Sequence, residues 1–274
     1  MKVFYHNDAD GKAAANVLHR HLPGGQKEED FIEITYGIPF PFHIISKDEY
    51  VWIVDYSIEP AEMKHLLLIT PNVTWIDHHI TSIAKYKDFP VNIAGWRQDG
   101  IAGCLLTWMY LWDETDYHKA PKALQYIGDR DVWKWEFGDE SKFFFNGSEL
   151  CDLHPLSEDW EELYDHPDQV MLDGETIEKY KAQRNKLYIK AFAYTTIFEG
   201  HEANVINIGQ VDSSIFDSIE DLKPLQIMYV ETGEFIKVSL RSEGEVDVSQ
   251  IAQKYGGGGH KQASGFECEE LPWK

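Results

Sequence analysis

The sequence has few basic residues and few cysteines. Its 274 residues include 25 lysines and arginines against 47 aspartates and glutamates, which gives a net charge of −22. Most of such a surface repels a long polyanion, so any nucleic-acid substrate should be short. The three cysteines form no C-x-x-C pair. This argues against a disulfide framework or a structural zinc site and favours a reducing, cytoplasmic location.

Long hydrophobic runs are also missing. No stretch reaches the ~20 apolar residues that a membrane span needs, and the first residues lack the apolar core of a signal peptide. We therefore expect a protein made in the cytosol, with no membrane partner. The apolar content of 43% is enough for a sizeable core. By the usual length prior the chain forms one large domain or two smaller ones, and we expect two.

The first third of the chain repeats one pattern three times. Short runs of β-branched and aromatic residues at 3–5, 51–54 and 73–76 are each followed by acidic residues. Helix-like segments at 12–21 and 60–69 lie between them, which indicates an α/β fold with a parallel sheet. The acidic clusters would then lie at strand carboxyl ends, where open α/β sheets bind ligands.

Residues 100–112 are apolar nearly all round, as in a buried helix.

The rest of the chain suggests a second, smaller domain. Beyond residue 193 the sequence alternates like strands, with a hairpin turn at Thr232-Gly233 and a capped helix that starts at Asp247 or Ser249. The expected division is a catalytic domain over 1–168, a linker helix over 169–193 and a mixed α/β substrate-binding domain over 194–274.

Acidic and histidine side chains gather after the predicted strands. Alternation along an extended chain puts His6 and Asp8 on the same side, and an Asp-x-Asp pair directs two carboxylates to one point. Carboxylates this close repel one another unless cations neutralise them. Two divalent ions with mixed carboxylate and imidazole ligands fit Mn²⁺ best, with Mg²⁺ or Co²⁺ as alternatives. The carboxylates concerned are Asp8, Asp10, Asp55, Asp77 and Asp129.

Two adjacent histidines, His78 and His79, follow the third strand. Neighbouring side chains on an extended chain point to opposite sides, so both cannot serve the same ligand. One should bind metal while the other faces a substrate phosphate.

Taken together, these motifs resemble the DHH phosphoesterase superfamily. The segment His6-Asn7-Asp8-Ala9-Asp10-Gly11, the lone Asp55, the triplet Asp77-His78-His79 and the region of Asp129 match its four motifs in order. Residues 238–266 resemble its DHH-associated C-terminal domain. The superfamily includes oligoribonucleases, phosphatases of adenosine 3′,5′-bisphosphate (pAp) and single-strand-specific exonucleases.

The resemblance implies two Mn²⁺ ions that share one carboxylate. It assigns His6 and Asp8 to one ion, Asp10, His78 and Asp129 to the other, and Asp55 to both. Asp77 would orient His78, and His79 would contact the phosphate. The first motif is tighter than in the oligoribonuclease and pyrophosphatase branches, which makes His6 the least certain ligand. The fourth motif departs from the common Thr-Asp-Thr-Gly, so Asp131 is a rival to Asp129.

Four consecutive glycines, 256–259, end the helix of the second domain. Glycine permits positive φ and close approach of main-chain N–H groups to an anion. His260 and Lys261 follow directly, and Arg241 lies on the preceding strand. By resemblance, Arg241, Gly257, Gly258 and His260 would grip the nucleotide end of the substrate. Taken without the metal motifs, the glycines favour a flexible turn after the end of the helix.

We expect a two-metal phosphoesterase acting on short oligonucleotides, linear dinucleotides or 3′,5′-bisphosphate nucleotides. The alternatives are a single-strand-specific exonuclease on longer DNA or RNA, a pyrophosphatase or exopolyphosphatase, and a catalytically silent nucleotide sensor. Trp133 and Trp135 would stack on a base or pack in the core, and core packing is the more common role of large aromatics. A homo-oligomer is compatible with the sequence.

Overall fold

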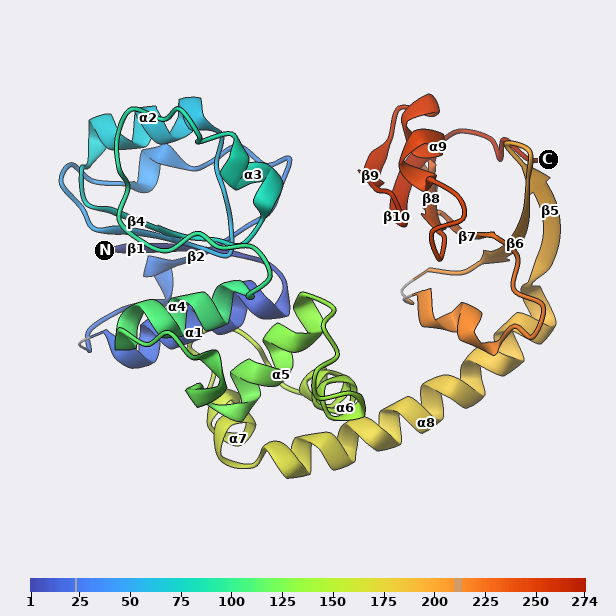
Figure 1. The fold of residues 1–274 in the computed structure, drawn as a ribbon, viewed down its shortest axis with the longest axis horizontal. Helices are drawn as coiled ribbons and strands as arrows, with labels where there is room; N and C mark the ends of the chain where they lie inside the picture. Colours follow the sequence, from blue (N-terminus) through green and yellow to red (C-terminus); the bar gives the residue numbers. More distant parts are fainter. Residues whose placement is uncertain (23, 210, 212) are drawn as a thin grey trace. The chain divides into compact units, whose positions relative to one another are not determined.

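The computed structural model describes residues 1–22, 24–209, 211 and 213–274. These residues form two compact units, Met1–Ile177 and Glu178–Lys274. The boundary between the units falls inside one long helix, α8 (Pro167–Phe192), shown in yellow in Figure 1. None of the helices in these residues is long and apolar enough to cross a membrane.

The first unit is built on a four-stranded parallel sheet in the order β2-β1-β3-β4. Three of its strands are the apolar runs that the sequence analysis identified, and the predicted α/β fold with a parallel sheet is confirmed. The edge strand β2 was not predicted, because an acidic residue, Glu33, interrupts its apolar run. The strands are β1 (Lys2–His6), β2 (Phe31–Ile34), β3 (Val51–Val54) and β4 (Val73–Ile76).

Helices cover both faces of this sheet, as a parallel sheet requires. In Figure 1, α1 (Ala9–His21) and α4 (Gly103–Trp112) lie on one face, and α2 (Pro60–Ile69) lies on the other with the short α3 (Ile80–Ala84). Alternate residues of β1 serve the two hydrophobic cores, and Phe4 belongs to the core beneath α2. Every residue of α4 from Gly103 to Met109 is buried, which confirms the prediction of a buried helix.

Three further helices complete the first unit. They are α5 (Lys122–Asp131), α6 (Asp139–Ser148) and α7 (Asp159–Asp165). The last two occupy a stretch that the sequence pattern left unassigned, and they bury Phe144 and Trp160 completely. Short 3-10 helices are found at Glu28–Asp30, Phe42–Ile44, Tyr117–Lys119 and, in the second unit, Ser213–Ser218.

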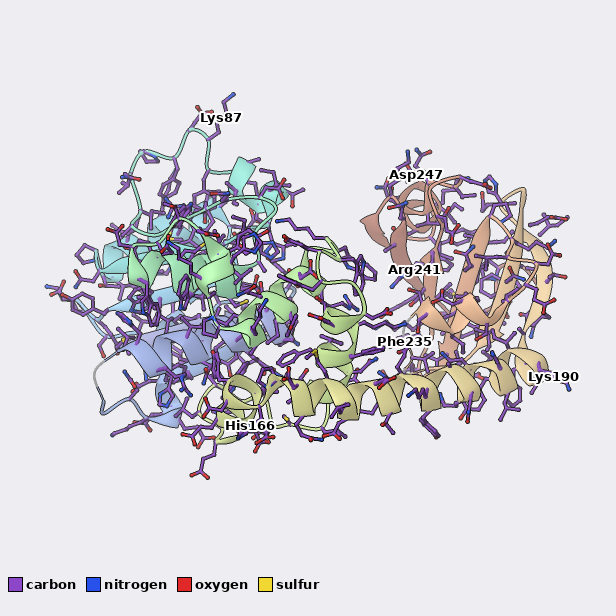
Figure 2. The ribbon with its side chains drawn as sticks, turned by 60° about the horizontal axis from the view of Figure 1, so that its bottom comes forward. Lys87, His166, Lys190, Phe235, Arg241 and Asp247 are labelled. Carbon is purple, nitrogen blue, oxygen red and sulfur yellow. The ribbon has the colours of Figure 1, made fainter. Side chains whose placement is uncertain are left out.

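The second unit contains a six-stranded mixed sheet in the order β5-β6-β7-β8-β10-β9. Only β6 and β7 pair in parallel; the other neighbours are antiparallel. Asp247 caps α9 (Val248–Lys254), since its side chain accepts a hydrogen bond from the backbone N–H of Ser249. Figure 2 labels Asp247 and Arg241, the last residue of β8. The strands are β5 (Tyr194–Phe198), β6 (His201–Asn207), β7 (Leu225–Glu231), β8 (Ile236–Arg241), β9 (Gly258–His260) and β10 (Ala263–Cys268).

Candidate metal centre and active site

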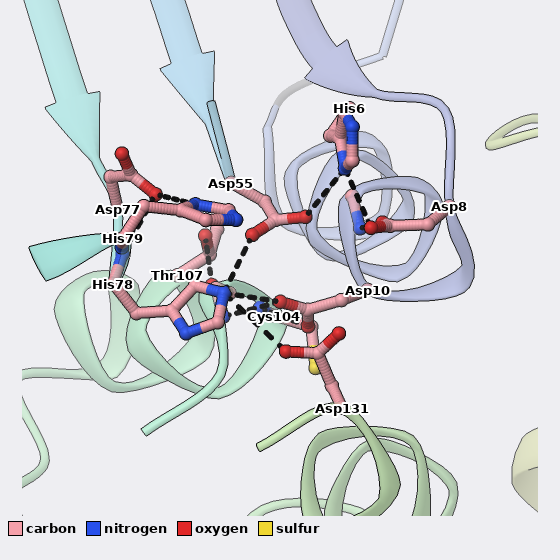
Figure 3. A network of polar contacts seen from close by, with 12 residues as sticks. His6, Asp8, Asp10, Asp55, Asp77, His78, His79, Cys104, Thr107 and Asp131 are labelled. Carbon is pink, nitrogen blue, oxygen red and sulfur yellow. Dashed lines mark hydrogen bonds and ion pairs between the residues drawn. The ribbon is translucent and has the colours of Figure 1, made fainter. Parts of the chain in front are cut away.

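The carboxyl ends of three adjacent strands bring polar side chains to one edge of the first sheet. In the register, Tyr5 pairs with Val54 and Val54 pairs with Ile76. The residues that follow these three positions are His6, Asp55 and Asp77, and Figure 3 shows them side by side. The sheet register therefore gathers three of the predicted motifs without any contribution from the loops.

The first motif continues into α1, whose N-terminus turns back toward the sheet. Asp8 is the N-cap of α1 and accepts a hydrogen bond from the backbone of Gly11 at 2.9 Å. Its other oxygen lies 2.6 Å from Nδ1 of His6. A Cβ atom at Gly11 would lie 2.2 Å from the carbonyl oxygen of His6. The glycine of the motif therefore allows the helix to pack directly on the strand that precedes it.

Asp10 is held by the N-terminus of α4. The backbone N–H groups of Gly103 and Cys104 donate to its two carboxylate oxygens at 2.6 and 2.8 Å. The N-cap of α4 is Ala102, which has no side chain to cap the helix, so Asp10 supplies the missing acceptor. A Cβ atom at Gly103 would lie 2.6 Å from Cβ of Asp55, so only glycine fits there. The sequence analysis did not identify Gly103. The sequence feature that could have pointed to it is an apolar helix that begins without a capping residue of its own.

Asp55 lies at the centre of the cluster and is 0% exposed. Neither of its carboxylate oxygens has a hydrogen-bond partner among the described residues, and its backbone is in the left-handed region with φ of 53°. Burial, followed by repulsion from Asp10 and Asp8, raises the pKa of this carboxyl well above its ordinary value. A buried, unpaired carboxylate is costly. A cation beside both oxygens would remove that cost.

His78 points into the same cluster. Its Nε2 atom lies 3.1 Å from Oδ1 of Asp55, 3.4 Å from Oδ2 of Asp131 and 3.7 Å from Oδ2 of Asp10. Three carboxylate oxygens around one imidazole nitrogen form the donor set expected for a hard or borderline divalent cation.

Asp131 reaches this cluster and takes the position expected for Asp129 (Figure 3). The Asp129 carboxylate accepts hydrogen bonds from the backbone N–H groups of Glu136 and Phe137 and from the hydroxyl of Ser141. Both aspartates belong to α5, where residues two apart point about 200° away from each other, so only one can face the sheet edge. Burial and repulsion from Asp10 raise the pKa of Asp131 to about 8.

The described residues contain three groups of side chains that could hold a metal ion. Within each group, the ligand atoms lie within 4.8 Å of one another. Two of them, His6-Asp8-Asp55 and Asp10-His78-Asp131, lie on either side of Asp55. Oδ2 of Asp55 is 3.8 Å from His6, and Oδ1 is 3.1 Å from His78. The chemistry and spacing of these donors fit two divalent cations that share one carboxylate. The third group consists of Asp55, His78 and His79.

Asp77 orients His79 rather than His78. Its Oδ1 atom lies 2.7 Å from Nδ1 of His79, and its other oxygen accepts a hydrogen bond from the hydroxyl of Ser57. For His78 it accepts only from the backbone N–H, at 2.8 Å. Burial opposes the charge of Asp77, but hydrogen bonding to His79 and Ser57 outweighs it and lowers the pKa of Asp77. Burial likewise opposes the charge of His79, and Asp77 raises its pKa overall.

An aromatic pair that the sequence analysis missed lies beside the cluster. The ring of Tyr36 lies 5.6 Å from that of His6 and 6.2 Å from that of His79, centroid to centroid. It stacks on Tyr56 at 4.6 Å. Tyr36 follows the unpredicted strand β2, so no motif pointed to it.

The second unit has a pocket of about 560 Å³ lined by Arg241, Lys237, Tyr255 and the four glycines 256–259. A Cβ atom at Gly257 would lie 2.1 Å from the carbonyl oxygen of Gly265, whereas Gly258 faces open space. Gly257 is thus needed for close packing, and Gly258 leaves its backbone accessible from the pocket. His260 ends β9, and its side chain is outside the described part of the chain.

Comparison with known proteins agrees with this architecture. The model of the DHHA1 domain matches residues 190–272. The oligoribonuclease NrnB of Bacillus subtilis (strain 168) is 27% identical over 293 residues, which cover 96% of this chain and 71% of that protein.

Two solved structures share the fold. The pGpG-specific phosphodiesterase PggH of Vibrio cholerae has a TM-score of 0.54 at 12% identity, covering 98% of this chain and 93% of its own. Exonuclease RecJ bound to manganese has a TM-score of 0.52 at 16% identity, covering 98% and 86%.

The parallel sheet, the Asp/His cluster at its carboxyl edge and the mixed-sheet unit define a two-unit α/β protein with a candidate metal centre. The DHHA1 match over residues 190–272, the relative NrnB and the fold shared with PggH and RecJ support the predicted resemblance to the DHH phosphoesterase superfamily. These three proteins are named as an oligoribonuclease, a phosphodiesterase and an exonuclease, in agreement with the predicted class of hydrolases that act on ester bonds.

Proposed function

We propose that the protein is a cytoplasmic, Mn²⁺-dependent phosphodiesterase that hydrolyses short oligonucleotides or linear dinucleotides, or removes phosphate from 3′,5′-bisphosphate nucleotides. The observation that carries this proposal is Asp55. Its two buried oxygens lack hydrogen bonds among the described residues, and each lies toward a separate group of metal ligands. A solely structural aspartate would be expected to have hydrogen-bond donors.

Two divalent cations would complete this site. His6 and Asp8 would hold one, Asp10, His78 and Asp131 the other, and Asp55 both. Asp131 replaces Asp129 in this set, because Asp129 is engaged by backbone donors. When bound, such a pair of cations activates water and stabilises negative charge on the phosphoryl group.

His79 supplies the acid of the proposed reaction. Asp77 accepts from Nδ1, which fixes the ring and leaves Nε2 available on its other side. Burial opposes the charge of His79, but Asp77 raises the pKa of His79 overall, which favours the protonated ring. Nε2 of His79 would donate first to a phosphoryl oxygen and then to the leaving oxygen. Ser57 fixes Asp77 from the other side, so the pair cannot rotate freely.

The second unit would bind the nucleotide end of the substrate. Arg241 and the accessible backbone of Gly258 line its pocket, and both suit phosphate oxygens. We propose Arg241, Gly257, Gly258 and His260 as substrate-binding residues. We also propose that residues 1–168 are the catalytic domain, that 169–193 link it to the next, and that 194–274 are the substrate-binding domain.

Two observations favour short substrates. The net charge of −22 opposes binding of a long polyanion. The relative NrnB is named an oligoribonuclease, and PggH is described as specific for pGpG. RecJ, which shares the fold, is an exonuclease, so hydrolysis of longer strands is the second candidate.

A substrate panel tests the proposal. The purified protein with Mn²⁺ would be assayed against pApA, pGpG, pAp, a 24-nucleotide single strand and inorganic polyphosphate. We expect the highest kcat/KM on a dinucleotide or pAp and a shallow dependence on salt. A steep salt slope with preference for the long strand would favour the exonuclease, and release of phosphate from polyphosphate alone would favour the exopolyphosphatase. Binding without turnover of any substrate would indicate a sensor.

A further inference from the structure

One surface feature of the first unit has no role in the site described above. Trp133 is 61% exposed and lies two residues beyond Asp131, the last residue of α5. Two residues of extended chain span at most about 7 Å, so the two Cα atoms are close. Tryptophan is enriched at binding interfaces, where its large apolar ring makes contacts and its N–H stays polar.

The backbone around Trp133 is held in an unusual conformation. Trp133 and Trp135 have φ of 53° and 54°, in the left-handed region that bulky residues rarely adopt. The hydrogen bonds from Glu136 and Phe137 to Asp129 hold this loop in place. Strain of this kind persists where the surrounding structure imposes it, and it is common at ligand-binding sites.

The indole of Trp133 is supported from one side. The guanidinium of Arg130 lies 4.4 Å from the ring centroid, and the half-buried Trp135 contacts Trp133 edge to face at 5.3 Å. Arg130 in turn lies 4.8 Å from the ring of Phe145. Arg130 covers one face of the indole, so the exposed surface lies on the other. The result is a rigid aromatic surface that is open for stacking.

We propose that Trp133 stacks on a nucleobase of the substrate, next to the phosphate that the metal centre cleaves. This inference rests on the proposed function. Stacking suits this chain because its negative charge gives little long-range attraction for a nucleotide, so affinity must come from local contacts. Stacking needs no charge and accepts every base. It also distinguishes an oligonucleotide from pyrophosphate or polyphosphate, neither of which has a ring to stack.

The test compares a substrate that has bases with one that lacks them. The variants Trp133→Ala and Trp133→Phe would be assayed with Mn²⁺ on pApA and on the same dinucleotide with both bases removed. Trp112 offers a matched control: it is 48% exposed, stacks on Trp108 and lies at the opposite end of α4 from Gly103. Trp112→Ala removes another exposed indole, at the end of α4 that is farther from the centre.

We expect Trp133→Ala to lower kcat/KM for pApA by about 10-fold or more. Trp133→Phe should recover most of that loss, because phenylalanine keeps a stacking face. Cleavage of the abasic dinucleotide should be the same for all variants, and Trp112→Ala should match the wild type on both substrates. Equal losses on the two substrates, or no loss on pApA, would overturn the inference and leave the proposed function standing.

A binding measurement separates this inference from the proposed function. Saturation-transfer NMR with AMP reports contact between the protein and the adenine ring without any turnover. We expect the adenine signal to be lost in Trp133→Ala and kept in Trp112→Ala. If the wild type cleaves none of pApA, pGpG and pAp, the proposed function fails while this signal still decides whether Trp133 stacks. An unchanged signal in Trp133→Ala would refute stacking.

Discussion

The metal centre of the first unit and the glycine pocket of the second differ in the charge of the groups that line them. The centre concentrates carboxylates until one of them, Asp55, has neither solvent nor a hydrogen bond in the described structure. The pocket is lined by Arg241, Lys237 and the backbone of four glycines, with Glu267 also in its lining. The first arrangement is electrostatically incomplete without cations, whereas the second suits an anion as it stands. We propose that one unit binds metal and the other binds the phosphate that the metal acts on.

Among the substitutions that test this comparison between the metal centre and the pocket, we expect the largest effect at Asp55. Replacing it with asparagine removes the carboxylate that faces both ligand groups, and we expect kcat to fall by at least about 100-fold. The same change removes a buried charge without hydrogen bonds, so the metal-free protein should be as stable as the wild type or more stable. Steady-state kinetics and thermal unfolding in EDTA measure the two effects. Retention of wild-type Mn²⁺-dependent turnover would show that Asp55 holds no cation.

Asp131 and Asp129 form a matched pair on one helix. We expect Asp131→Asn to weaken Mn²⁺ binding by about 10- to 100-fold and to leave the metal-free protein intact. Asp129→Asn should instead destabilise the fold by about 1–3 kcal/mol, because it weakens three hydrogen bonds to a buried carboxylate, and should change Mn²⁺ affinity less. Calorimetric titration with Mn²⁺ and denaturant unfolding separate the two. The reverse pattern would restore Asp129 as the ligand.

These two residues also show where sequence reasoning ends. The apolar runs predicted β1, β3 and β4, and strand ends in a parallel sheet share one edge, so the positions of His6, Asp55 and Asp77 followed from local pattern. The fourth motif lies on a helix, where the angular position of the helix decides which aspartate faces inward. That angle depends on packing against α6 and the sheet, which no local pattern encodes.

Contacts between distant segments were equally hidden. Asp10 caps α4 across 93 residues of sequence, and the signal was only the absence of a capping residue at Ala102. Tyr36 reaches the centre because a short edge strand carries it there. The exposure of Trp133 contradicts the expectation of core packing, since aromatic residues are buried on average but individual cases depend on the loop that holds them.

A smaller effect is expected in the second unit. Arg241→Ala should raise KM for a dinucleotide by about 10-fold with little change in kcat, because a phosphate contact made before and during the reaction contributes equally to both states. Lys190→Ala is the control, an exposed cation on α8 of the same unit (Figure 2). If both variants behave alike, general loss of positive charge explains the result and the pocket is not the binding site.

The smallest effect concerns pH and depends directly on the crowded carboxylates. The pKa of Asp131 is raised to about 8 in the folded protein, far above its value of 3.8 in an unfolded chain. The folded state therefore binds this proton more tightly, so its contribution to stability is present at low pH and is lost as pH rises through 8.

In EDTA, we expect the free energy of unfolding to fall between pH 6 and pH 8 by about 1–2 kcal/mol more in the wild type than in Asp131→Asn. Saturating Mn²⁺ should abolish that difference, because bound cations favour the ionised carboxylates at both pH values. Urea unfolding of both proteins at the two pH values, with and without Mn²⁺, measures it. If the free energy of unfolding depends on pH in the same way for both proteins in EDTA, the pKa of Asp131 is not raised. Repulsion at Asp131 would then give no reason for a cation to bind there.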